Sequence, residues 1–229
     1  MQKRTFRHYP SLYFWAVVLF LLSSGSATLY ATCDPTACPQ SPNKPTWEIG
    51  PRPDKWAIPM KHTCDVPNFY KINDNLYRSG QPTKCGFIQL YQMGIRTIIN
   101  LREFPWDNDK EGEKVGLKIF NVRINGGLIA NDAETNKAVL EVINILKDQK
   151  RWPVLIHCLH GSDRTGFICA LYRILIEKWC IDDAINEMVN GGYGFHRDFF
   201  INIINSIEDE KNIKELRKTL GIEKQCPSQ

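Results

Sequence analysis

The segment VLIHCLHGSDRTGF occupies residues 154–167 and is the most informative part of this 229-residue chain. Its first three residues, Val154 to Ile156, are apolar and predict a short buried strand. Five residues separate Cys158 from Arg164, and the largely apolar stretch 167–179 then predicts a helix. A buried strand that leads through a short loop into a helix is the repeating unit of α/β folds. We therefore expect the motif to lie where a strand of such a sheet ends.

Further strands and helices alternate around this motif. Strands are expected at 75–78, 96–101 and 117–122, and helices at 87–94, 138–146, 181–189 and 195–207, with an amphipathic tail at 213–220. This order predicts an α/β fold with a central, mostly parallel sheet of about four to five strands, flanked by helices. The C-terminal half is predicted to be helical.

The composition suits one domain of ordinary size. Hydrophobic residues make up 43% and charged residues 24% of the chain, which excludes a wholly disordered chain and a membrane protein with many spans. The formal net charge is +4, but residues 1–27 hold three basic residues and no acidic one. Because the remainder is nearly neutral, we expect no nucleic-acid partner.

The N-terminus has the features of an export signal. Three basic residues precede an apolar run from Leu12 to Leu22, and small residues follow at 23–27. The apolar run has eleven residues, whereas a membrane-spanning helix needs about 20. We therefore expect residues 1–27 to be a signal peptide and the protein to be exported, either periplasmic or secreted. An uncleaved membrane anchor is the alternative, with membrane contact through this segment only, and lipidation of Cys33 is a less favoured third.

A proline-rich stretch follows the signal segment. Residues 28–67 contain eight prolines and scarcely any apolar periodicity, which predicts an extended arm or linker. The main domain is expected at 68–222 and a short tail at 223–229. We expect the protein to be a monomer.

The eight cysteines gain significance from the predicted export, because an oxidising compartment permits disulfides. No two pairs have matching metal-ligand spacing, so we expect no metal. Cys33 and Cys38 pair with each other, or each pairs with Cys64 or Cys226, and the sequence leaves this choice open. If Cys158 stays reduced, seven cysteines remain, so a further thiol is free or intermolecular.

The loop after the strand at 154–156 has the features of an anion-binding site with a nucleophile. The spacing of Cys158 and Arg164 lets successive backbone N–H groups point inward at the start of the following helix. Gly161 permits a backbone conformation that other residues resist. The Arg164 guanidinium suits two phosphate oxygens at once, and with the helix dipole it favours the Cys158 thiolate. Cys158 is therefore predicted to attack phosphate monoesters, without any cofactor.

The same residues are compatible with two roles outside phosphate hydrolysis. In the first, Cys158 is a small buried apolar residue at a strand end and takes part in no chemistry. In the second, the loop serves sulfur transfer, a chemistry that does not require Arg164, Thr165 and Gly166 in this arrangement.

Residues 69–207 resemble the atypical dual-specificity branch of the protein tyrosine phosphatases, especially its small microbial members. The resemblance lies in LYRSGQP at 76–82, IINLRE at 98–103, the loop described above and GGYGFH at 191–196. It implies the cysteine-dependent phosphatase fold, with the phosphatase domain at 68–222. It also implies hydrolysis of phosphate monoesters in proteins, on phosphotyrosine and also on phosphoserine or phosphothreonine, through a cysteinyl-phosphate intermediate.

The resemblance assigns roles to the residues of the loop. It makes Cys158 the nucleophile and Arg164 the phosphate clamp. It implies that Thr165 donates a hydrogen bond to the thiolate and that His157 orients the loop and tunes the sulfur. The other phosphate-binding positions are Leu159, His160, Gly161, Ser162 and Asp163.

The general acid that protonates the leaving oxygen has two candidates. The family supplies this residue from a loop before the preceding helix, where Asp132 stands 26 residues ahead of Cys158. An alternative role for Asp132 is to cap the helix that follows. Asp163, inside the phosphate loop, is the competing acid, and Glu134 is a spare.

The sequence says least about the substrate. The loop offers His160 but no lysine, and it contains Asp163, which weakens the case for an inositol-phosphate or phosphoinositide phosphatase without closing it. His196 and Arg197 are candidate contacts to a second phosphate; the alternative, which the glycines at 191 and 192 favour, is that the stretch is only a turn between two helices. Outside catalysis, the alternative is a phosphate-binding pseudophosphatase whose Cys158 is oxidised.

Overall fold

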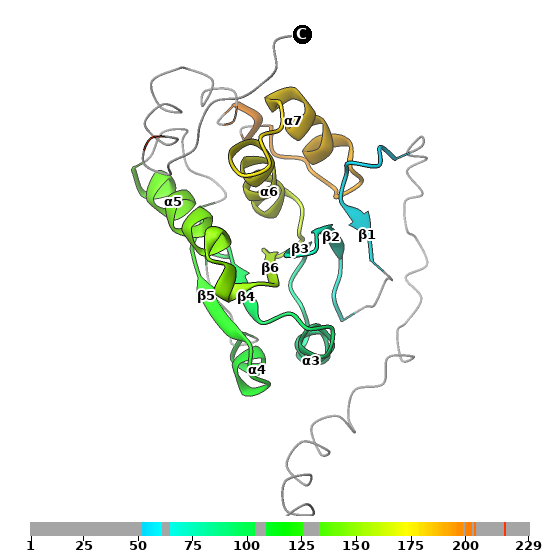
Figure 1. The fold of residues 1–229 in the computed structure, drawn as a ribbon, viewed down its shortest axis with the longest axis vertical. Coiled ribbons are helices and arrows are strands. Elements are labelled where there is room, and N and C mark those ends of the chain that lie inside the picture. The colour runs from blue at the N-terminus through cyan, green and yellow to red at the C-terminus, as the bar shows by residue number, and fades with distance from the viewer. Residues whose placement is uncertain are drawn as a thin grey trace, which may run out of the picture. The chain divides into compact units, whose positions relative to one another are not determined.

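The computed structural model describes residues 52–60, 65–103, 109–125, 133–198, 200–202, 204 and 218 (Figure 1). Six strands are present among them: β1 Ile58–Pro59, β2 Tyr70–Asn73, β3 Leu76–Ser79, β4 Thr97–Asn100, β5 Lys118–Asn121 and β6 Val154–His157. The helices are α3 Lys84–Gln92, α4 Asp109–Lys114, α5 Ala133–Lys147, the short 3-10 helix η1 Gln149–Arg151, α6 Asp163–Leu175 and α7 Ile181–Asn190. The predicted signal peptide at 1–27 and the predicted tail at 223–229 lie outside the described residues.

The strands form one mixed sheet in the order β1-β2-β3-β6-β4-β5. The strands β3, β6, β4 and β5 are parallel to one another, and Ser79 of β3 and Asn100 of β4 lie on either side of His157 in β6. The strands β1 and β2 extend the sheet next to β3 by antiparallel pairing. The predicted α/β class and mostly parallel sheet are confirmed. The expected four to five strands were too few, because β1 has only two residues and β2 buries only Ile72 well, so neither produces a periodic apolar pattern.

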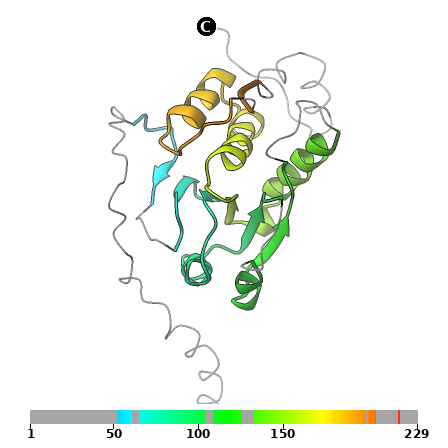
Figure 2. The ribbon, with the colours of Figure 1, turned by 180° about the vertical axis from the view of Figure 1, so that it is seen from behind.

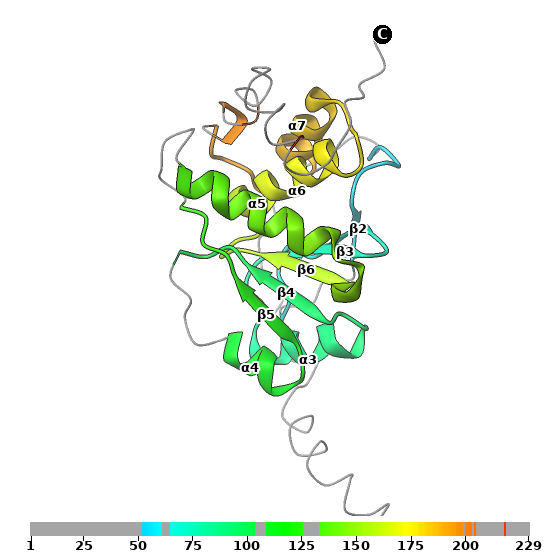
Figure 3. The same ribbon diagram turned by 60° about the vertical axis from the view of Figure 1, so that its left-hand side comes forward.

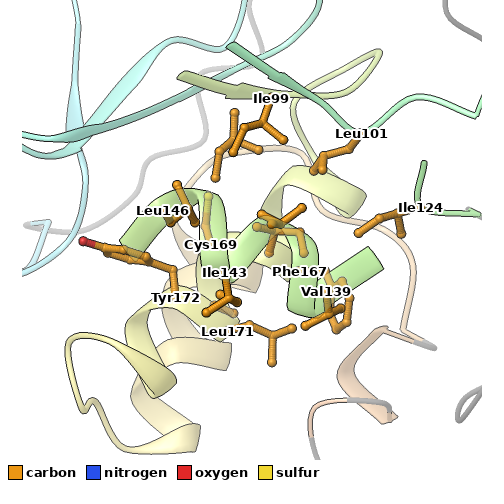
Figure 4. Packing of buried hydrophobic residues seen from close by; sticks show 14 of the residues in the cluster. Ile99, Leu101, Ile124, Val139, Ile143, Leu146, Phe167, Cys169, Leu171 and Tyr172 are labelled. Carbon is orange, nitrogen blue, oxygen red and sulfur yellow. The ribbon is translucent and has the colours of Figure 1, made fainter. Parts of the chain in front are cut away.

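Helices cover both faces of the sheet. Helices α5, α6 and α7 pack on one face, while α3 and α4 lie on the other (Figures 2 and 3). Alternate residues of a strand point to opposite faces, so Ile98 packs against α3 while Ile99 joins the larger core with α5 and α6. Figure 4 shows that larger core, where Phe167 of α6 lies among apolar side chains of α5 and β4. Because β6 is buried on both faces, its end is held rigidly.

The helix that follows the motif begins earlier than predicted. Helix α6 starts at Asp163 and ends at Leu175, whereas the apolar pattern had indicated 167–179. It starts within the polar loop because the N–H of Gly166 already bonds to the carbonyl of Ser162. It ends before Lys178, whose positive φ of 61° is incompatible with a continuing helix. Arg164 therefore stands in the first turn of α6.

Part of the predicted proline-rich arm packs on the sheet. Residues 52–60 supply β1, and Trp56 and Ala57 are buried. The domain therefore extends upstream of the boundary expected at residue 68. The short polar helix α4 was not predicted either, since its sequence DKEGEK lacks apolar periodicity.

None of the described helices has both the length and the apolar character needed to cross a membrane.

Candidate active site

The loop between β6 and α6 presents the Cys158 sulfur at the N-terminus of a helix. Cys158 is 3% exposed, and its Sγ accepts a hydrogen bond from the backbone N–H of Gly161 at 3.3 Å. The positive end of the α6 dipole lies next to this sulfur. A backbone donor and a helix N-terminus together favour a negative charge at this position, either on the thiolate or on a bound oxyanion.

The loop can close only because residue 161 is a glycine. Gly161 has φ +76°, and a Cβ atom built there would lie 2.5 Å from the carbonyl carbon of Ser79 and from the nitrogen of Gly80. Both of these atoms are backbone and belong to the end of the neighbouring strand β3. The tight approach of the loop to β3 therefore excludes any side chain at this position.

The carbonyl groups of the loop are held outward by donors from other elements. Those of residues 159, 160 and 161 accept hydrogen bonds from Gln81 N, Asn68 Nδ2 and Arg78 Nη2 at 3.0, 3.0 and 2.6 Å, respectively. Because a peptide unit points its N–H away from its C=O, anchoring these carbonyls orients the loop amides in the absence of a ligand. The anion site is therefore pre-organised by residues distant in sequence.

His157 is fully buried behind the sulfur. Its Nδ1 lies 3.2 Å from the carbonyl oxygen of Cys158, and its Nε2 lies 3.8 Å from Oδ1 of Asp109. Burial lowers the pKa of His157 to about 4, although the nearby Asp109 carboxylate raises it. The imidazole is therefore neutral near pH 7 and donates from Nδ1 to the Cys158 carbonyl, which fits a residue that orients the loop.

Thr165 does not make the expected bond to the sulfur. Its Oγ1 is buried and has no hydrogen-bond partner in the described part of the chain. The predicted Thr165–thiolate hydrogen bond is therefore absent from this structure, where the sulfur takes its hydrogen bond from the N–H of Gly161.

Arg102 is a second guanidinium at the site, to which the sequence analysis assigned no role. It follows β4, the parallel neighbour of β6, and is 7% exposed, with Nη1 donating to Gln81 Oε1 at 2.6 Å. Burial and, to a smaller extent, the positive charge of Arg164 lower the pKa of Arg102, whereas Asp109 and Cys158 raise it. Arg102 is therefore within electrostatic range of both predicted catalytic residues. The sequence signals for it were its position after a buried strand and its place in the motif IINLRE at 98–103.

Asp109 is a buried carboxylate that sequence reasoning also missed. It begins α4 and accepts hydrogen bonds from Gln81 Nε2, at 3.1 Å, and from Asn100 Nδ2. It lies between His157 and Arg102 at the carboxyl end of the parallel strands. No pattern could have singled it out, because its helix has no apolar periodicity.

The two candidate acids differ in what the structure describes. Asp132 lies outside the described residues, and of Glu134 only the backbone, in α5, is described. Both carboxylate oxygens of Asp163 are engaged by His196: Oδ1 accepts the backbone N–H at 2.9 Å, and Oδ2 lies 3.3 Å from Nδ1. Asp163 therefore links the first turn of α6 to the backbone of the 192–197 loop.

The remaining predicted residues divide into exposed and buried positions. Leu159 is 45% exposed, and His160, His196 and Arg197 are also exposed. Ser162 is buried, and its Oγ donates to a backbone carbonyl. The exposed residues are therefore accessible to a substrate, whereas Ser162 is part of the support of the loop.

The cysteines of the domain fall into two classes. Cys158 and Cys169 are free and buried, while Cys85 and Cys180 are disulfide-bonded. Burial raises the pKa of Cys169 to about 11, so this thiol is protonated. In this structure Cys158 is therefore a free thiol, as a cysteine nucleophile must be, whereas Cys85 and Cys180 are oxidised.

The fold and the site define a cysteine-dependent phosphatase architecture, and comparisons with known proteins agree. The family model for the tyrosine phosphatase family matches residues 64–224. The chain belongs to this family.

Two kinds of relative are found. Inositol diphosphatase DSP2 of Oryza sativa is 33% identical over 124 residues, which are 52% of this chain and 59% of that protein. Dual specificity protein phosphatase TpbA of Pseudomonas aeruginosa is 30% identical over 149 residues, which are 65% of this chain and 64% of that protein. The chain thus spans about three fifths of the length of these relatives.

Solved structures share the fold. The crystal structure of P. aeruginosa TpbA has a TM-score of 0.60 and 24% identity, and covers 73% of this chain and 98% of its own. The core catalytic domain of the PP-IP phosphatase SIW14 from S. cerevisiae, in complex with citrate, has a TM-score of 0.55 and 23% identity, and covers 68% of this chain and 94% of its own.

Proposed function

We propose that this protein is a phosphatase that hydrolyses phosphate monoesters through Cys158. The observation that carries the proposal is the position of the Cys158 sulfur, which accepts the Gly161 N–H at the N-terminus of α6. A nucleophile held where an anion binds is the arrangement that phosphoryl transfer needs. Membership of the tyrosine phosphatase family supports the same activity.

The reaction follows from these groups. The Cys158 thiolate attacks phosphorus, the S–P bond forms, and the bond from phosphorus to the ester oxygen breaks. Arg164 and the loop amides bind the oxygens of the transferred phosphoryl group, and the leaving oxygen takes a proton from a general acid, for which we propose Asp132. A water molecule then attacks phosphorus, cleaves the S–P bond and releases phosphate.

The substrate we favour is phosphotyrosine in a protein, with phosphoserine and phosphothreonine as further substrates. The apolar side chain of Leu159 is 45% exposed directly beside Cys158, where it suits the ring of an aryl ester. The loop also contains Asp163 and no lysine, so it offers little extra charge for a highly anionic ligand. The relative TpbA, named a dual specificity protein phosphatase, supports this assignment.

An inositol phosphate or phosphoinositide is the second candidate substrate. The observation that favours it is Arg102, a second buried guanidinium within electrostatic range of Arg164. Two neighbouring cations repel each other, and a ligand with several phosphates would offset that repulsion. Relatives named inositol diphosphatases support this alternative.

The location we propose is outside the cytoplasm, periplasmic or secreted, with the N-terminal segment acting as a signal peptide. The charge and apolar pattern of residues 1–27 supports it, and the disulfide-bonded Cys85 and Cys180 are compatible with an oxidising compartment. Mass determination of the mature protein would test this proposal, because a chain that still begins at Met1 would contradict signal cleavage.

The activity is tested by release of phosphate from p-nitrophenyl phosphate. Wild type should turn this ester over, and Cys158→Ser should abolish turnover. Cys169→Ser is the matched control, because it makes the same change at the other free, buried thiol. Turnover that survives in Cys158→Ser would overturn the proposal.

A panel of phosphotyrosine peptides, phosphoserine peptides and inositol polyphosphates, with and without reductant, then decides the substrate. Preference for the phosphotyrosine peptides supports the first assignment, and preference for the inositol polyphosphates replaces it with the second.

A further inference from the structure

The backbone carbonyl of Tyr193 is bonded to the phosphate loop from two directions. It accepts a hydrogen bond from Ser162 Oγ at 2.7 Å and another from Asn68 Nδ2 at 2.9 Å. The same amide of Asn68 also donates to the carbonyl of His160 at 3.0 Å. Tyr193 O is thus the shared acceptor that ties two positions of the loop to the turn after α7.

The ring of Tyr193 supports a third position of the loop through Arg78. The Arg78 guanidinium carbon lies 3.6 Å from the ring centroid, and its Nη2 donates to the Gly161 carbonyl. Both side chains are 2% exposed, and no carboxylate of the described residues pairs with Arg78. The aromatic face therefore carries much of the stabilisation of this buried cation.

The hydroxyl of Tyr193 connects the ring to a segment upstream of the predicted domain. It donates to Glu187 Oε1 at 3.1 Å and accepts from Arg52 Nη2 at 2.7 Å. Arg52 also donates to the Gly191 carbonyl, and the N–H of Ala57 donates to Glu187 Oε1 at 2.6 Å. Burial raises the pKa of Tyr193, so the hydroxyl keeps its proton and the connection persists across the working pH range.

We propose that Tyr193 is a positioning residue through which residues 52–57, the docked segment, hold the phosphate loop in its anion-binding conformation. The inference rests on the proposed function, since it assigns the loop to phosphate binding. The loop amides are oriented by outward bonds of their carbonyls, and Tyr193 supports these bonds at residues 160 and 161 and also holds Ser162. Breaking the bond between Arg52 and Tyr193 therefore loosens the loop without touching the nucleophile.

The test compares three single variants of the full chain. Arg52→Ala removes the docked segment's bond to the Tyr193 hydroxyl, and Tyr193→Phe removes the same bond from the other side while keeping the ring and the carbonyl. Lys55→Ala is the matched control, because Lys55 belongs to the same segment but pairs with Asp183 at 2.8 Å and lies over the Trp179 ring. Binding of inorganic tungstate is measured by calorimetry, together with turnover of p-nitrophenyl phosphate.

We expect Arg52→Ala and Tyr193→Phe each to weaken tungstate binding about tenfold, as for loss of a charge-assisted hydrogen bond, and to lower kcat/KM in parallel. Lys55→Ala should bind like wild type. Because the two variants share the bond between Arg52 and the Tyr193 hydroxyl, the loss in the double variant should be smaller than the sum of the single losses, whereas independent structural damage would add.

Tungstate affinity of Arg52→Ala equal to that of Lys55→Ala, or additive losses in the double variant, would overturn the inference. Failure of the proposed function is a different result. In that case wild type binds tungstate and shows the same variant pattern, but it does not turn over the ester.

Discussion

Replacing Gly161 with alanine should damage the phosphate loop far more than an ordinary glycine substitution would. Two costs add at this position. A non-glycine residue in the left-handed region costs about 1–2 kcal/mol. In addition, the new Cβ would lie 2.5 Å from backbone atoms of Ser79 and Gly80, which cannot rotate away. Overpacking of this kind costs about 1–3 kcal/mol, so the free energy of unfolding should fall by about 2–5 kcal/mol.

Gly94→Ala is the matched control for this prediction. Gly94 also has a positive φ, +96°, but a Cβ there would have no atom within 4 Å. It should therefore lose only the conformational part, about 1 kcal/mol, and keep full activity.

Urea unfolding of both variants, followed by circular dichroism, measures these free energies. Turnover of p-nitrophenyl phosphate should fall about 100-fold or more in Gly161→Ala, because the amide that faces the sulfur moves. If Gly161→Ala is no less stable than Gly94→Ala and keeps its activity, the close contact between the loop and β3 is not what shapes the site.

Three further predictions concern charged groups. Arg102→Gln should lower kcat/KM about tenfold on inositol polyphosphates and less on p-nitrophenyl phosphate. Arg96→Gln is the control, because Arg96 directly precedes β4 whereas Arg102 follows it. Equal losses on both substrates would contradict a role of Arg102 in binding extra phosphates. The pKa of His157 is about 4 in the folded protein and 6.5 in the unfolded chain, so the unfolded state binds the proton first as pH falls. The free energy of unfolding should therefore fall by about 3 kcal/mol as the pH is lowered from 6.5 to 4, and His157 should have no effect on it above pH 6.5. Urea unfolding across this pH range should show a shallower loss in His157→Gln, and an unchanged slope would refute the assignment. Glu187→Gln should lower the free energy of unfolding by about 1–3 kcal/mol in thermal unfolding, because the buried Arg173 loses its bond to the Glu187 carboxylate at 2.8 Å and keeps only its pairing with Glu177. A change below about 0.5 kcal/mol would show that the Arg173–Glu187 pair contributes little to stability.

Most of the fold was predictable because its signals are local. The apolar runs at 96–101, 117–122 and 154–156 correspond to β4, β5 and β6, and the stripe at 138–146 lies within α5. The elements that were missed are short or polar. The edge strand β1 forms through pairing with β2, and no side-chain pattern announces that pairing.

The candidate site was only half predictable. Cys158, Gly161 and Arg164 were predicted from spacing, because the conformation of a short loop is encoded by the residues within it. Asp109 belongs to no motif, and Arg102 lies in the motif at 98–103 but was assigned no role from it. They reach the site because parallel pairing of β4 with β6 sets their backbone beside the loop, a consequence of register and not of local sequence.

The amino-acid sequence by itself indicated the family, the order of the central strand, loop and helix, and the predicted nucleophile, since each is carried by short motifs whose own residues lie within about ten positions of one another. Only the tertiary structure decided which residues hold the phosphate loop in its anion-binding conformation. Its supports at Asn68, Arg78 and Tyr193 come from two regions of the chain on opposite sides of the motif in sequence. Buried hydrogen bonds of that kind depend on how the sheet and helices pack, and packing is a property of the whole domain.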